Sequence, residues 1–155
     1  MEKVTFYKID TGYLKKLRAK DSRVSLKNNR AFVGVLIEIN KQDYCIPLTS
    51  TVVPASGKKR HPMVTVNVLD DENKPIACLL VNNMIPVKTE VCERIDFNLL
   101  PEDKKRYHIE EYIYISQNCD NIFRKANSIY NYRIGGKNPF LNSVCCDYKL
   151  LEENM

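Results

Sequence analysis

The sequence predicts a single α+β domain, residues 1–155, in which a twisted antiparallel β-sheet is covered by helices. Between residues 31 and 87, strand-like segments follow one another with short links and without the helices that separate strands in βαβ units. After about residue 100, apolar residues instead recur at three- and four-residue steps. A chain of 155 residues fits one such domain, which buries roughly 68–70% of its unfolded surface.

The first strand is expected over residues 4–9, a short segment rich in β-forming side chains. The sequence Asp10-Thr11-Gly12 then breaks the strand. Asp10 or Thr11 can cap a short basic helix that runs to about Ala19.

The strongest strand signal is residues 31–39, AFVGVLIEI, which is β-branched and apolar on both faces and therefore predicts a central, buried strand. Residues 40–43 predict a turn, and residues 44–48 the partner strand of a hairpin. Residues 63–69 alternate cleanly, so they predict a further strand. Two more strands are expected over residues 76–81 and 84–87.

The C-terminal third is predicted to be helical. A proline and two acidic residues over 100–103 are typical of a helix start. The apolar stripe is broken near residues 116–118, so it indicates one interrupted helix or two short ones, ending at Gly135-Gly136. Residues 139–151 predict a final helix or extension. The expected core stripe comprises Ile109, Tyr112, Ile113, Ile122, Phe123, Ala126, Ile129 and Tyr130.

The net charge of +5 is placed unevenly, because residues 1–30 hold nine basic and three acidic side chains. A second basic cluster is Lys58-Lys59-Arg60-His61. Clustered positive charge is typical of a protein that binds a polyanion such as RNA. An ordinary solvated surface would explain the same charge.

Several classes of protein are excluded by composition. No apolar run approaches the length of a membrane span, and the N-terminal residues lead into no signal-peptide core, so a cytoplasmic domain is expected. The six cysteines include no CxxC pair and lie mostly in apolar runs, which indicates buried free thiols rather than disulfides or a zinc site. No nucleotide-binding, protease or hydrolase motif occurs, and we expect neither a metal nor a cofactor.

One group of polar residues could form a phosphate site. Arg30 begins one strand of the predicted hairpin, and Thr49 and Ser50 end the other, so antiparallel pairing would bring the three together at one rim of the sheet. Arginine supplies a forked positive charge, and the hydroxyls supply neutral donors. A plain turn at the strand end would also explain Thr49 and Ser50.

Three motifs occur in order along the chain: TFYKIDTGYLKKL, then RAFVGVLIEI…YCIPLTS, then NNMIPV. Together they resemble the ToxN/AbiQ family, the toxin endoribonucleases of type III toxin–antitoxin systems, and the helical tail agrees in length and character. The resemblance implies a core similar to the Kid/MazF RNases. It also implies a non-coding RNA antitoxin whose repeats are processed into pseudoknots that bind a basic groove and close into a protein–RNA assembly.

The resemblance also implies site residues. The family's serine and threonine fall on Ser50 and Thr49, its basic residue on Arg30, and its first-helix tyrosine on Tyr13. The sequence departs from the family at Arg30, where lysine is frequent, and after Ser50, where a lysine is replaced by Thr51.

A mechanism follows from these residues. Attack by the 2′-hydroxyl of the RNA on the adjacent phosphate needs positioning and charge stabilisation, not a protein nucleophile. Arg30 with Lys58 or Lys59 would stabilise the charge, Ser50 and Thr49 would orient the phosphate, and Tyr13 would stack on a base or transfer a proton. The expected RNA-binding residues are basic: Lys15, Lys16, Arg18, Lys58, Lys59, Arg60 and His61, the last also a candidate acid or base. The alternatives are a non-catalytic nucleic-acid-binding module with the same basic face and a protein-interaction domain.

Overall fold

A hairpin of two eight-residue strands, β2 (Phe32–Ile39) and β3 (Gln42–Thr49), forms the centre of the sheet. The computed structural model describes residues 4–26 and 32–155. Asn40 and Lys41 join the two strands with positive φ values of 51° and 66°. This geometry is typical of a two-residue type I′ turn, whose twist matches that of the strands. The turn is therefore shorter than the four residues expected from the sequence.

Gly34 allows β2 and β3 to approach closely. A Cβ atom at this position would lie within 3.0 Å of the Ile46 carbonyl oxygen and of Cys45 Sγ. Since the carbonyl belongs to the backbone of the paired strand, it cannot move aside without disturbing the register Gly34↔Pro47. The glycine is thus required by packing and not by a turn.

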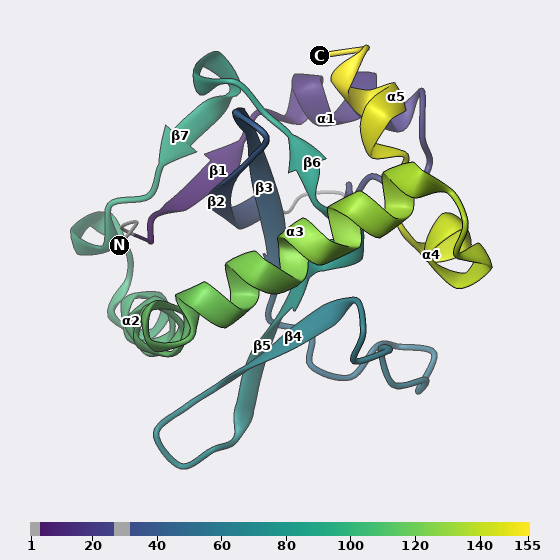
Figure 1. The fold of residues 1–155 in the computed structure, drawn as a ribbon. Coiled ribbons are helices and arrows are strands. Elements are labelled where there is room, and N and C mark those ends of the chain that lie inside the picture. Colours follow the sequence, from purple (N-terminus) through teal and green to yellow (C-terminus); the bar gives the residue numbers. More distant parts are fainter. Residues whose placement is uncertain (1–3, 27–31) are drawn as a thin grey trace.

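The remaining strands extend the sheet on both sides of the hairpin (Figure 1). They are β1 (Phe6–Ile9), β4 (Thr65–Leu69), β5 (Pro75–Leu80), β6 (Ile85–Pro86) and β7 (Cys92–Arg94). The strand order is β4-β5-β3-β2-β1-β7, with β6 paired to β3, and every pairing in this seven-stranded sheet is antiparallel. The predicted antiparallel α+β fold is confirmed. The edge strand β7 was not expected.

The first helix, α1 (Thr11–Arg18), lies between β1 and β2 in the chain. The Asp10 carboxylate accepts a hydrogen bond of 2.9 Å from the Tyr13 backbone N–H and caps the helix, as the sequence predicted. Tyr13, Leu14 and Leu17 face the core.

The C-terminal third is helical, as expected, and is divided into four α-helices. They are α2 (Glu102–Gln117), α3 (Cys119–Gly135), α4 (Pro139–Val144) and α5 (Tyr148–Glu152). The break between α2 and α3 falls at Asn118, within the predicted interval. Short 3-10 turns, η1 (Val81–Asn83), η2 (Thr89–Val91) and η3 (Phe97–Leu99), complete the connections.

Helix α3 crosses one face of the sheet (Figure 1), where its Tyr130 ring packs edge-on against Tyr44 of β3 with centroids 5.5 Å apart. Tyr148 of α5 stacks on the same Tyr130 ring at 5.6 Å. The Glu152 carboxylate accepts hydrogen bonds from the hydroxyls of Tyr44 and Tyr130, at 2.6 and 2.8 Å. These contacts attach the last helix to the middle of the sheet.

The predicted core stripe is confirmed for α3 but is wrong for part of α2. Ile109 and Ile113 are 39% and 48% exposed, whereas Glu111 and Ile115 face inward. The helix packs near β4 and β5 along a face rotated from the one that its isoleucines suggest. The residue that this rotation buries, Glu111, belongs to the candidate site described below.

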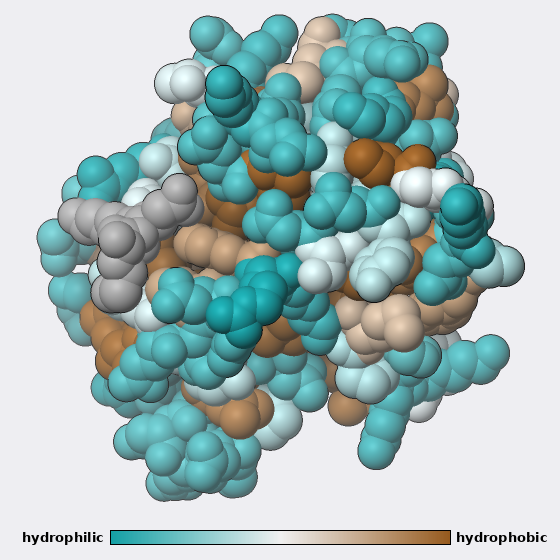
Figure 2. Space-filling view, viewed as in Figure 1, coloured by the Kyte–Doolittle hydropathy of each residue, from teal (hydrophilic) through white to brown (hydrophobic). Residues whose placement is uncertain are grey.

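The surface in the same view is mainly hydrophilic, with hydrophobic side chains visible between the polar ones (Figure 2). Of the helices that the structure describes, none combines the length and apolar character needed to cross a membrane.

Candidate functional site

The beginning of β2 and the end of β3 border a cavity of about 210 Å³. One wall comes from this hairpin, and another comes from α2. The lining residues are mostly apolar with a few polar groups, an arrangement typical of a ligand site: Leu14, Ser25, Phe32, Val33, Pro47, Leu48, Thr49, Ser50, Leu80, His108 and Glu111.

The two hydroxyl residues at the end of β3 differ in exposure. Thr49 is only 9% exposed, and its Oγ1 accepts a hydrogen bond of 3.1 Å from the Thr51 backbone N–H. Ser50 is exposed at the rim of the cavity. Thr49 is therefore held in place within the turn, while the Ser50 hydroxyl is accessible to a ligand.

The third residue of the predicted cluster, Arg30, lies outside the described residues. The described part of the hairpin does place Phe32 and Val33, two and three positions further on, in the lining with Thr49 and Ser50. The proximity of the two hairpin ends is thus confirmed, and the placement of the guanidinium beside them stays a prediction.

The wall from α2 contains a pair of titratable residues that the sequence reasoning missed. His108 and Glu111 stand three residues apart on α2, with His108 Nδ1 2.6 Å from Glu111 Oε1. The two side chains are 20% and 5% exposed. A histidine and a glutamate at this spacing on a predicted helix share a face, and this signal could have revealed the pair.

Aromatic rings hold the imidazole of His108 in place. Phe97 stacks on it at a centroid distance of 5.6 Å and an interplanar angle of 21°, and Phe6 meets it edge-on at 5.6 Å. With these rings and the Glu111 carboxylate around it, the imidazole has little freedom to rotate.

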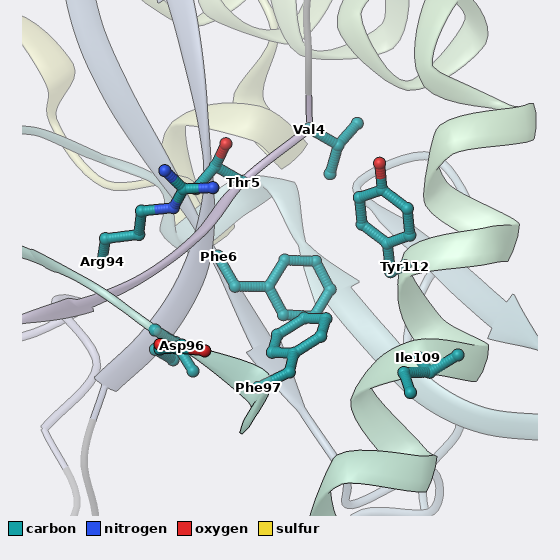
Figure 3. Close-up of a pocket in the computed structure, with 9 residues that line it drawn as sticks. Val4, Thr5, Phe6, Arg94, Asp96, Phe97, Ile109 and Tyr112 are labelled. Atoms are coloured by element: carbon teal, nitrogen blue, oxygen red, sulfur yellow. The ribbon is translucent and has the colours of Figure 1, made fainter. Parts of the chain in front are cut away.

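A second cavity, of about 660 Å³, is lined in part by these two phenylalanine rings. Figure 3 shows Phe6 and Phe97 side by side in its wall, with Ile109 and Tyr112 extending from α2. Arg94 and Asp96 provide its charged groups. His108, which lines the smaller cavity, thus contacts two rings that line the larger one.

The predicted basic residues after Ser50 lie in the exposed loop before β4. Lys58 and Lys59 are exposed. Arg60 Nη1 donates to the backbone oxygens of Thr51 and Val52, the latter at 3.1 Å, so its side chain shapes the segment that follows Ser50.

His61 is positioned away from the cavity lining. Its Nδ1 accepts a hydrogen bond of 3.1 Å from the Met63 backbone N–H, and its ring lies 4.6 Å from that of Phe140 on α4. Of the chain's two histidines, His108 is the one that lines the cavity with Ser50.

The basic side chains of α1 form a separate exposed face. Lys15 and Lys16 are exposed, and Arg18 Nη1 donates to the Val24 carbonyl oxygen at 2.6 Å. Leu14, on the buried face of the same helix, lines the cavity, whereas the three basic residues are outside its lining.

Tyr13 is buried, and its hydroxyl donates to the Pro86 carbonyl oxygen at 2.6 Å. Burial raises the pKa of this phenol above its ordinary value. The hydroxyl thus joins α1 to β6, and the residue is outside the cavity lining. A catalytic role for Tyr13 stays a prediction that this geometry does not favour.

All six cysteines are free, and five of them are buried, as the sequence predicted. Burial raises the pKa of the Cys45 thiol well above its ordinary value and that of Cys146 to about 12. Within residues 4–26 and 32–155, no group of three or more His, Cys, Asp or Glu side chains is arranged to hold a metal ion.

The chain is similar to known proteins over almost its whole length. A family model described as "Toxin ToxN, type III toxin-antitoxin system" matches residues 5–155. The endoribonuclease ToxN of Bacillus thuringiensis subsp. kurstaki is 36% identical over 160 residues, covering 96% of this chain and 80% of that protein. The endoribonuclease AbiQ of Lactococcus lactis subsp. lactis is 30% identical over 157 residues, covering 95% and 85%.

Solved structures have the same fold. A structure concerned with selective toxin inhibition by a non-coding RNA pseudoknot in type III systems matches with a TM-score of 0.84 at 34% identity. AbiQ, described as a lactococcal anti-phage endoribonuclease of a type III system, matches with a TM-score of 0.84 at 25% identity. Each match covers 98% of this chain and 95% of the other.

Proposed function

Because this chain belongs to the ToxN family of type III toxin–antitoxin systems and is therefore an endoribonuclease toxin, we propose that it cleaves RNA without a metal ion. In this reaction the 2′-hydroxyl of one nucleotide attacks the adjacent phosphorus. The products carry a 2′,3′-cyclic phosphate and a 5′-hydroxyl. The observation that supports this proposal is the cavity that holds Thr49 and Ser50 together with an ionisable wall from α2.

The protein's task in such a reaction is to hold the phosphate in line and to stabilise the charge that develops on it. The exposed Ser50 hydroxyl donates to a non-bridging phosphate oxygen, and Thr49 fixes the backbone turn that presents it. Arg30, with Lys58 or Lys59, supplies the positive charge. The arginine's forked donors suit a phosphate with two accessible oxygens.

The partner of this toxin is a non-coding RNA antitoxin, as in the pseudoknot-inhibited structure that it matches. The antitoxin binds through its phosphates to the basic residues of α1 and of the loop before β4, and closes with the toxin into a protein–RNA assembly. These residues are Lys15, Lys16, Arg18, Lys58, Lys59, Arg60 and His61. Bound there, the antitoxin would cover the cavity and keep substrate RNA from Ser50.

We further propose that the sheet core is related to that of the Kid/MazF RNases. The toxin acts in the cytoplasm on cellular or phage RNA. It contributes to phage defence there, as the anti-phage character of the similar AbiQ suggests.

The direct test compares wild type, Ser50→Ala and Ser22→Ala on a labelled RNA in EDTA. Ser22 is an exposed serine outside the cavity and serves as the matched control. We expect wild type and Ser22→Ala to yield cyclic phosphate ends, and Ser50→Ala to be slower by about 10²–10³-fold. Full activity of a folded Ser50→Ala variant would remove Ser50 from the mechanism. Loss of wild-type cleavage in EDTA would contradict metal independence.

The non-catalytic alternative, a nucleic-acid-binding module, predicts salt-sensitive RNA binding with no new RNA ends. Product analysis of the wild-type reaction separates the two functions, because only a nuclease produces cyclic phosphate termini.

A further inference from the structure

The mechanism above requires a group that takes the proton from the attacking 2′-hydroxyl. Ser50 and Thr49 are poor bases, and an arginine keeps its proton throughout the physiological pH range. The described lining of the cavity contains one imidazole and one carboxylate, His108 and Glu111.

The hydrogen bond between these two residues determines which nitrogen of His108 can act. An ionised carboxylate only accepts hydrogen bonds, so with Glu111 ionised the 2.6 Å contact with its Oε1 requires the proton on Nδ1. In the neutral ring, Nε2 therefore has the free lone pair. Among the residues that the structure describes, none makes a hydrogen bond to this Nε2.

We propose that His108 is the general base of the RNA cleavage reaction and that Glu111 is its positioning residue. This inference rests on the proposed function, since it assumes attack by the 2′-hydroxyl. The surroundings support the assignment, because Phe97 and Phe6 fix the plane of the ring and the nearly buried Glu111 fixes its tautomer. A base oriented by a third group is a recurring arrangement in catalytic sites.

The step balances without a further reactant. The 2′-oxygen forms a bond to phosphorus, the bond from phosphorus to the 5′-oxygen breaks, and the 2′-hydroxyl proton passes to Nε2 of His108. The leaving 5′-oxygen takes a proton from water. His108 then returns its proton to the solvent, and no atom is oxidised or reduced.

Among the described residues, the recorded contacts of the imidazole are with one carboxylate and two uncharged rings. On its own helix it faces Glu111. From β1 and η3 it meets the uncharged rings of Phe6 and Phe97. The charged residues of the cavity that these rings line are Arg94 and Asp96.

The main experiment measures kcat and KM for wild type, His108→Gln and Tyr107→Gln from pH 5 to pH 9. Tyr107 is the adjacent residue on α2, is 54% exposed, and is the matched control. We expect His108→Gln to lower kcat by about 10²–10⁴-fold with little change in KM. A general base acts only when it is unprotonated, so the wild-type rate should rise with pH. This rise should disappear in His108→Gln and persist in Tyr107→Gln.

Rescue separates a chemical role from a packing role. Free imidazole should restore part of the activity of His108→Ala, because it can enter the space left beside Phe6 and Phe97 and accept the proton. If the variants fold poorly, Glu111→Gln provides a second test with Glu110→Gln as its control. Glu111→Gln should lower kcat and alter the pH profile, whereas Glu110→Gln should do neither.

The two proposals fail in different ways. If wild type gives cyclic phosphate ends and His108→Gln retains its rate and pH profile, the role of His108 is wrong and the cleavage route stands. If wild type gives no cyclic phosphate ends, the cleavage route itself is wrong. A 5′-thio leaving group that restores the rate of His108→Gln would identify His108 as the general acid and overturn its assignment as the base.

Discussion

The Asp21 carboxylate, only 5% exposed, accepts a hydrogen bond of 2.6 Å from the backbone N–H of Asp147, which is 126 positions further along the chain. Its other oxygen accepts from Arg23 Nε at 2.8 Å and from the Arg23 backbone N–H at 3.0 Å. Arg23 in turn donates to the Asn142 carbonyl oxygen. The segment after α1 is thereby joined to α4 and to the connection between α4 and α5.

Asp21→Asn should destabilise the protein at neutral pH. Burial alone would raise the pKa of the Asp21 carboxyl, but the hydrogen bonds from Arg23 and Asp147 outweigh it and lower the pKa below its ordinary value. The stabilisation is therefore complete above the unfolded-state pKa, near 3.9, and is lost as the pH falls below it. Denaturant titrations should show a loss of about 1.5–3 kcal/mol at pH 7.

The same titrations repeated down to pH 3 check the sign. The wild type should lose more stability below about pH 4 than Asp21→Asn, because only the wild type has this carboxylate to protonate. Asp71→Asn, in the exposed β4–β5 turn, is the control and should behave as wild type. Equal acid sensitivity of wild type and Asp21→Asn would contradict this role.

Gly34→Ala should destabilise the sheet. The added Cβ would meet backbone and side-chain atoms of β3, so strands β2 and β3 must separate, at a cost of about 1–3 kcal/mol. Gly135→Ala is the matched control, since its Cβ would meet nothing within 4 Å. A thermal melt in which Gly34→Ala unfolds at the wild-type temperature would show that the strands tolerate the extra atom.

Tyr44→Phe should weaken the attachment of α5 to the sheet. The Glu152 carboxylate would lose its shorter hydrogen bond and keep the one from Tyr130. Hydrogen bonds to charged groups contribute about 1.5–3 kcal/mol, so we expect a loss of that size in chemical denaturation. Tyr132→Phe changes a 65% exposed ring and should have no effect. If the two variants were equally stable, the Glu152 contact would be shown to contribute nothing.

Lys58→Ala and Lys59→Ala should each weaken RNA binding and reduce its dependence on salt. Each phosphate contact to single-stranded RNA contributes about 0.7 to the slope of log affinity against log salt. Titrations at several salt concentrations should show this decrease, and Lys88→Ala, also exposed, should retain the wild-type slope. If the slope of log affinity against log salt were unchanged in both variants, RNA would not contact the loop before β4.

Thiol reagents should distinguish Cys92 from the other cysteines. It is the one cysteine that is half-buried, while the other five are buried. Burial and the carboxylates of Asp43 and Glu90 raise its thiol pKa as well, so its accessibility distinguishes it. We expect one thiol of the native protein to react ahead of the other five, and all six to react after denaturation. Fast reaction of several native thiols would contradict the packing of the core.

The sequence predicted those parts of the fold that local patterns determine. The apolar run of β2, the cap at Asp10 and the helix break near Asn118 each depend on adjacent residues. Strand β7 was missed because Cys92, Glu93 and Arg94 show no alternation, and their pairing with β1 comes from tertiary contact. Ile109 was predicted to be buried because it belongs to a helical apolar pattern, but it is exposed. The pattern identified the helix correctly and its buried face incorrectly.

The candidate site was predicted in part. Thr49 and Ser50 follow from the hairpin, because antiparallel pairing fixes which residues share its open end. His108 was not assigned to the site, since its meeting with the hairpin depends on how α2 packs against the sheet. The three-residue spacing of His108 and Glu111 was visible in the sequence. The cavity that both side chains line could not be predicted from it.

The turn at Asn40 and Lys41 is at the end of the central hairpin opposite Ser50, about 25 Å away for strands of this length. Both turn residues are exposed. A fluorophore or affinity tag attached there would remain on the protein in its RNA assembly. It would not alter the residues of the candidate site. The hairpin that lines the cavity therefore also provides, at its other end, a labelling site for following the active toxin.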